Sequence, residues 1–325
     1  MRRSKDRSKG QQRHVALLGP QHSRRTLRSV LDGIGAKGPY ALVSAGWQER
    51  EAETGALEGH VGEPVTNLGL WPATEDAFQR DEELKRLMFA RYDRMNDLAR
   101  VYRVRLAAEL EALRDLLGRT DPGDPDDLVG PALDPAFAAL AALDGHHRAR
   151  IAELDDEVFE KVRARDVVRR ERERIRKHVD RAGTLLVAGG HVGILYNRMR
   201  MFGVPDDLEP TADVVGWSAG AMVLTDTIVL FHDDPPHGAG DAEVLGPGFG
   251  LAPGIVALPH AASRLHLDDR ARVALAARRF APSLVVALDD GENVRRASAG
   301  WHLDGEARVL RADGRVDARE LEGAR

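Results

Sequence analysis

The chain has 325 residues, of which 43% are hydrophobic and 30% are charged, and its formal net charge is -5. These values are ordinary for a globular protein, leave room for a sizeable core and give no reason to expect nucleic acid as a partner. The sequence has no cysteine, which excludes disulfides, thiolate metal ligands and a thiol nucleophile. Serine is therefore the first candidate for any covalent catalysis.

The first 13 residues are basic and polar and lack the apolar segment of a signal peptide. We therefore expect a disordered arm over residues 1–13 and a cytoplasmic protein. No uninterrupted apolar run approaches the roughly 20 residues that span a bilayer, so no membrane contact is expected.

Strand and helix patterns alternate over residues 14–74, which we expect to form the first part of an α/β domain. Buried strands are predicted at 14–19, 40–47 and, more weakly, 65–70, with a helix over 22–35 between the first two. This β-α-β order predicts a parallel sheet.

Residues 75–180 interrupt this alternation with two long, charged helical patterns, about 75–117 and 135–179. We expect a helical insertion folded as a hairpin. Its basic stretch also carries Glu171 and Glu173, which indicates a solvated helix face rather than a nucleic-acid surface. Because its apolar stripes need a partner, we expect the insertion to form a homodimer contact and to overhang the site entrance. Packing on its own domain is the alternative.

The alternation returns over residues 181–325, which we expect to form the second part of the domain and to carry the site. Strands are predicted at 183–190, 213–220, 254–260 and 283–291, with an amphipathic helix over 268–280 and short strands near the end. The predicted fold is α/β, with a doubly wound, mostly parallel sheet and a long helical insertion. In such sheets functional residues gather at the carboxyl ends of the strands.

Ser218 lies within Gly216–Gly220, a match to the G-x-S-x-G pattern in which a tight strand-to-helix turn exposes a nucleophilic serine. Such a serine needs a base to take its proton. His260, at the end of a predicted strand, is the candidate base, and Asp233 is the candidate acid that orients it, with Asp234 as the alternative. The competing interpretation is that Ser218 only caps the following helix.

The oxyanion of an acyl-transfer reaction also needs hydrogen-bond donors. The backbone N–H groups of Gly189 and Gly190, after the strand 183–190, are candidates together with that of Ala219. We expect no metal and no organic cofactor, because the histidines lack the spacing of zinc sites.

These motifs resemble those of the dipeptidase E (aspartyl dipeptidase) and cyanophycinase family of serine peptidases. The family pattern G-x-S-A-G-A is matched from Gly216 to Ala221, and Ala188–His191 resembles the family's glycine turn. Asp233 takes the place of the family's aspartate, fifteen residues after the serine. His260 and Arg264 resemble its histidine followed four residues later by arginine, and "VVALDDGENV" resembles the strand after its site.

The resemblance implies a fold like that of class I glutamine amidotransferases and a serine peptidase that cleaves a small peptide or isopeptide bond, aspartyl ones first. His191 and Arg264 are then the candidate substrate-binding residues, Arg264 because a guanidinium suits a carboxylate. His191 departs from the family's asparagine, which leaves the substrate open. The alternative function is a non-catalytic binding or scaffold protein on the same fold, with the helical insertion as its interaction element.

Overall fold

The structure, a computed structural model, describes residues 13–119, 126–234, 238–297, 300–304 and 307–317. In this part of the chain a central sheet has the strand order β11-β10-β1-β5-β4-β2-β3. The strands β1 to β5 in it run parallel, and β10 and β11 are antiparallel. Their bounds are β1 (Val15–Leu18), β2 (Tyr40–Val43), β3 (Val65–Asn67), β4 (Thr184–Val187), β5 (Asp213–Trp217), β10 (Asn293–Ala297) and β11 (Gly300–Asp304).

The middle strands β1, β2, β4 and β5 are buried at every position, as expected for parallel strands that are covered on both faces. Their register aligns the strand ends, since Leu18 pairs with Trp217 and Val43 with Val187. The loops that follow these four strands therefore lie along one edge of the sheet.

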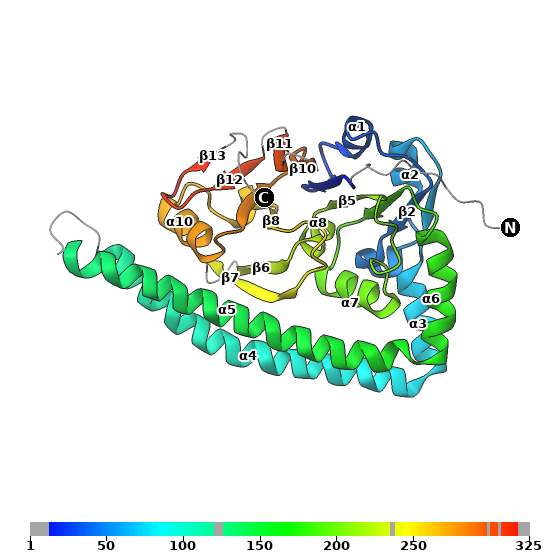
Figure 1. The fold of residues 1–325 in the computed structure, drawn as a ribbon, viewed down its shortest axis with the longest axis horizontal. Helices are drawn as coiled ribbons and strands as arrows, with labels where there is room; N and C mark the ends of the chain where they lie inside the picture. Colours follow the sequence, from blue (N-terminus) through cyan, green and yellow to red (C-terminus); the bar gives the residue numbers. More distant parts are fainter. Residues whose placement is uncertain (1–12, 120–125, 235–237, 298–299, 305–306, 318–325) are drawn as a thin grey trace.

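Helices cover both faces of the central sheet, so the predicted doubly wound α/β arrangement is confirmed (Figure 1). On one face Leu27, Leu31 and Val61, from α1 (Leu27–Gly33) and α2 (Gly55–Val61), pack with residues such as Leu18 and Leu42. The larger core on the other face includes α3 (Leu70–Arg80), α6 (Asp166–Val179), α7 (Val192–Phe202) and α8 (Ala219–Leu224). A 3-10 helix, η1 (Ala45–Arg50), follows β2.

Two predicted strands of the C-terminal part do not join the central sheet. β8 (Ile255–Pro259) and β9 (Leu284–Leu288) pair in parallel within a smaller sheet of order β13-β12-β9-β8. The prediction of a single sheet was wrong here, because a run of buried residues does not reveal which strand it pairs with. The remaining elements are β6 (Thr227–Asp234) and β7 (Gly238–Pro247), which pair as a hairpin, and β12 (Arg308–Leu310), β13 (Val316–Asp317), α9 (Ala261–Arg264) and α10 (Arg270–Arg279).

The predicted helical hairpin is confirmed in α4 (Glu82–Gly118) and α5 (Asp126–Arg163), which run side by side along one side of the molecule (Figure 1). Leu106 and Leu113 of α4 pack with Leu140 of α5 and Val244 of β7 in one apolar cluster. The hairpin therefore packs on its own α/β domain, which was the alternative expectation, and the homodimer contact stays a prediction.

The helix α5 is long and apolar enough over Leu128–Arg163 to cross a membrane, with a mean hydropathy of 1.2 in its most apolar window. No continuous apolar run marks this window in the sequence, because polar residues, glycine and proline interrupt it. Phe137, Leu140 and Leu143 of this helix are buried in the cluster with α4 and β7, but only 33% of the apolar window is buried, and one such helix is weak evidence for a membrane.

Candidate active site

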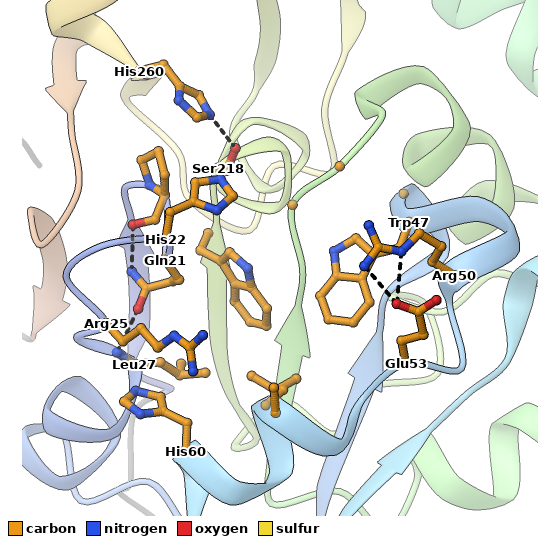
Figure 2. A pocket seen from close by; sticks show the side chains of 17 residues that line it. Gln21, His22, Arg25, Leu27, Trp47, Arg50, Glu53, His60, Ser218 and His260 are labelled. Atoms are coloured by element: carbon orange, nitrogen blue, oxygen red, sulfur yellow. Dashed lines mark hydrogen bonds and ion pairs between the residues drawn. The ribbon is translucent and has the colours of Figure 1, made fainter.

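A cavity of about 580 Å³ lies where the carboxyl ends of β1, β2, β4 and β5 meet (Figure 2). Its size is within the range of roughly 300–1,000 Å³ that is typical of small-molecule sites. The lining residues that follow these strands include His22 after β1, Trp47 after β2, Gly189 after β4 and Ser218 after β5. His260, after β8, completes the wall nearest Ser218.

Ser218 is the turn residue between β5 and α8, with φ 51° and ψ -120°. A non-glycine residue at positive φ is uncommon and costs conformational energy. Its N–H donates to the Leu18 oxygen at 3.0 Å, and its own carbonyl oxygen accepts from the Met222 N–H at 3.2 Å, so both sides of the turn are fixed. Ser218 is therefore the N-cap residue of α8 by position, but its side chain makes no capping hydrogen bond, so the hydroxyl does not serve as a helix cap.

The Oγ of Ser218 lies 3.3 Å from Nε2 of His260. His260 also has a left-handed backbone, with φ 60° and ψ 37°, and its N–H donates to the Leu288 oxygen of β9 at 3.0 Å. The short helix α9 starts directly after it. The turn at the end of β8 therefore directs the imidazole from the smaller sheet toward the serine on the central sheet (Figure 2).

Several groups around His260 determine its protonation. Burial is the main cause that holds the pKa of His260 below its ordinary value, and the nearby Arg264 guanidinium and His22 imidazole lower it further. The carboxylates of Asp289 and Asp290 raise it in part. A lowered pKa keeps the imidazole neutral near pH 7, the form that can accept a proton.

The side chains of Asp233 and Asp234, the predicted orienting acid and its alternative, lie outside the residues whose side chains the structure describes. Their backbones belong to β6, where they pair with Ala239 and Gly238. The predicted role of Asp233 thus stays a prediction.

Asp289 and Asp290, directly after β9, are carboxylates for which the sequence predicted no role. Asp289 accepts the Ala262 N–H at 3.0 Å in the turn after His260, and an Arg308 N–H at 2.6 Å. Asp290 accepts the His22 N–H at 3.2 Å. The two side chains therefore fix the loops on either side of the serine and histidine pair.

Two of the predicted oxyanion donors, Ala219 and Gly189, lie against the serine. Ala219 is the first residue of α8, so its N–H has no acceptor within the helix. A Cβ added to Gly189 would lie 3.0 Å from the Ser218 Cβ. Gly190 has φ 108°, and a Cβ there would lie 2.3 Å from the Gly46 oxygen, so only glycine fits this turn.

The two predicted substrate-binding residues do not line the cavity. The Nδ1 of His191 accepts the Ile194 N–H at 3.3 Å and caps α7. Arg264 ends α9, close enough to His260 to affect its pKa. The side chain of His191 thus serves the helix, and a substrate-binding role for either residue stays a prediction.

Most of the side chains that line the cavity away from Ser218 were not predicted from the sequence. They come from the segments that follow β1 and β2, which include α1, η1 and α2, and the strand-end rule applied to these two strands points only to the nearest of them, such as His22 and Trp47. These residues are Gln21, His22, Arg25, Leu27, Trp47, Arg50, Glu53, Leu57 and His60.

No residue of the helical insertion within the described part lines this cavity, so the predicted overhang of the entrance is not seen within a single chain. The described residues also contain no group of three or more histidine or acidic side chains that could hold a metal ion.

No protein-family model matches the chain, and no curated protein matches it either. Among solved structures, a crystal structure of a peptidase from an acI-B1 Actinobacterium is similar to it. The similarity has a TM-score of 0.45 and 13% sequence identity, and it covers 97% of this chain and 96% of that one. Similarity at this level does not extend to activity or substrate.

Proposed function

We propose that the protein is a serine hydrolase that cleaves a peptide or isopeptide bond in a short substrate. The observation that carries the proposal is the 3.3 Å distance between the Ser218 Oγ and the His260 Nε2 at the end of a cavity of about 580 Å³. The strained backbone of Ser218 supports it, because strain of this kind persists where a function needs it.

In the proposed reaction, His260 takes the proton of the Ser218 hydroxyl as the oxygen attacks the carbonyl carbon. The oxyanion of the tetrahedral intermediate is bound by backbone N–H groups of Gly189, Gly190 and Ala219. His260 then gives the proton to the leaving amine, and the C–N bond breaks to leave an acyl-serine. A water molecule, deprotonated by His260, hydrolyses this ester and restores the serine.

The proposed triad acid is Asp233, with Asp234 as the alternative, on the resemblance to dipeptidase E and cyanophycinase. Asp289 and Asp290 are two further candidates, because their charges raise the pKa of His260. The same resemblance makes aspartyl peptides the first substrates to test, with no metal and no organic cofactor required.

The test is a panel of α- and β-linked aspartyl, neutral and basic dipeptides, offered to the wild type and to Ser218→Ala. We expect turnover of some members by the wild type, and a loss of about 10⁴-fold or more in Ser218→Ala. Circular dichroism of both proteins checks that the variant stays folded. Equal turnover by the two proteins would reject Ser218 as the nucleophile, and no turnover of any member would favour the scaffold alternative.

A further inference from the structure

The cavity is also lined by large apolar side chains that the proposed reaction does not use. Trp217 is buried beside the serine, Trp47 is half-buried in η1, and Leu27 and Leu57 come from α1 and α2. Aromatic side chains of this size bury much of any apolar group that they contact. This wall therefore favours a bulky apolar group over a small polar one such as an aspartyl side chain.

Trp47 is held in place by the backbone around it. Its N–H donates to the Ser44 oxygen at 2.8 Å, and the next residue, Gln48, has φ 59° and ψ -126°. The turn that presents Trp47 to the cavity therefore has a strained residue, as does the turn that presents Ser218.

Arg25 supplies a positive charge at the end of the cavity away from Ser218 and His260 (Figure 2). In the part of the chain that the structure describes, its guanidinium has no ion pair and no hydrogen bond. Arg50 lies on the opposite wall and donates two hydrogen bonds to the Glu53 carboxylate, at 2.9 and 2.7 Å. The positive charge of Arg50 is therefore already compensated. The uncompensated charge of the wall is thus that of Arg25.

His60, beside Arg25, adds no second positive charge near pH 7. Burial is the main cause that lowers the pKa of His60, and the charges of Arg25 and Arg28 lower it further. Its Nε2 lies 3.4 Å from the backbone nitrogen of Arg28, which suits a neutral ring that accepts this N–H. A single guanidinium next to a neutral imidazole is well suited to bind one carboxylate.

We propose that the cavity selects a ligand that combines a bulky apolar, preferably aromatic, group with a carboxylate. The apolar group packs on Trp47, Trp217 and Leu57, and Arg25 binds the carboxylate. This selectivity refines the proposed function, since such a ligand is the recognised part of the substrate that Ser218 attacks, and it assigns the carboxylate to Arg25 instead of Arg264.

The test measures binding in Ser218→Ala, so that turnover cannot interfere. Isothermal titration calorimetry compares three probes: N-acetyl-phenylalanine, its uncharged amide, and N-acetyl-alanine. We expect N-acetyl-phenylalanine to bind at least about tenfold more tightly than either of the others, the size of effect that one charge-assisted hydrogen bond or one buried ring supplies.

A second substitution in the same protein assigns the charge. Arg25→Gln should weaken binding of N-acetyl-phenylalanine about tenfold and remove its advantage over the amide. Arg24→Gln is the matched control, because Arg24 is in the same loop, carries the same charge and does not line the cavity. Equal binding of acid and amide, equal losses in the two variants, or no binding of any probe would overturn the inference.

Failure of this inference and failure of the proposed hydrolase function give different results. Selective binding by Ser218→Ala together with a wild type that hydrolyses no peptide would reject the hydrolase and keep the inference. Hydrolysis by the wild type together with equal binding of acid and amide would reject the inference alone.

Discussion

The edge of the sheet that carries the cavity and the helical insertion differ in their backbone strain. In the described part of the chain, the non-glycine residues at positive φ are Gln48, Ser218, His260 and His266. Ser218 and His260 line the cavity, and Gln48 follows a residue that does. The described residues from 70 to 189, which include α3 to α6, contain no residue at positive φ.

The helical insertion instead has buried polar side chains that are fully paired. Arg91 of α4 forms an ion pair with Asp155 of α5, and both side chains are at most 1% exposed. Asp155 also accepts the Tyr196 hydroxyl of α7 at 2.8 Å. This cluster links the hairpin to a helix that packs on the central sheet.

The two regions therefore differ in the role of their backbone conformation and of their polar side chains. At the sheet edge, energetically costly turns hold a serine, a histidine and a tryptophan in one cavity, which is expected of a functional site. In the insertion, regular helices and paired charges serve stability and specific packing. Substitutions in the two regions should therefore change different measured quantities.

The largest expected change in stability is in the insertion. Arg91→Met leaves the Asp155 carboxylate buried without its cationic partner, which should lower the free energy of unfolding by about 3–5 kcal/mol. Urea unfolding measures the loss, with Arg94→Met as the control, because Arg94 is exposed on the same helix. A loss in Arg91→Met no larger than in the control would contradict this account of the insertion.

A smaller difference in stability is expected at the sheet edge, where relieving backbone strain should stabilise the protein. Glycine tolerates positive φ better than alanine, so Ser218→Gly should be about 1 kcal/mol more stable than Ser218→Ala, although neither hydrolyses substrate. Thermal unfolding of the two variants side by side checks the difference. If the alanine variant is the more stable, the turn at Ser218 is not strained.

The smallest expected effect is on pH dependence. Neutral His260 is the proposed base, and its pKa is lowered chiefly by burial, so the acid limb of kcat/KM should lie below the ordinary histidine value of about 6.5. Removing the nearby positive charge in Arg264→Ala should raise the pKa and move this limb to higher pH. A limb that moves to lower pH, or stays in place, would show that another group sets it.

The sequence predicted much of the site because its strongest signals are local. The pattern Gly216–Gly220 specified a turn, and a buried strand that ends in Pro259 and His260 placed the histidine at a strand end. The parallel order of the middle strands followed in the same way from the local β-α-β pattern. The meeting of the two side chains did not follow from the strand-end rule alone, because His260 ends β8 of the smaller sheet and Ser218 follows β5 of the central sheet.

Other features depend on contacts between distant segments, and no local pattern encodes them. The pairing of β8 with β9 in a separate sheet is one example, and the pairing of Arg91 with Asp155 across 64 positions is another. Arg25 and Trp47 were predicted as ordinary residues of a helix and of a buried strand, and only the placement of the segments after β1 and β2 around one cavity reveals their position. Arg264 was assigned a carboxylate by its distance from His260 along the chain, which does not determine whether its side chain lines the cavity.

The most direct test of the central claim is to label the protein with a fluorophosphonate, which reacts with serines that a base has activated, and to map the modified residue by mass spectrometry. The account predicts a single modified serine, Ser218, and labelling that becomes much slower in a folded His260→Ala variant. Modification of a different serine, or no modification of the folded wild type, would contradict it.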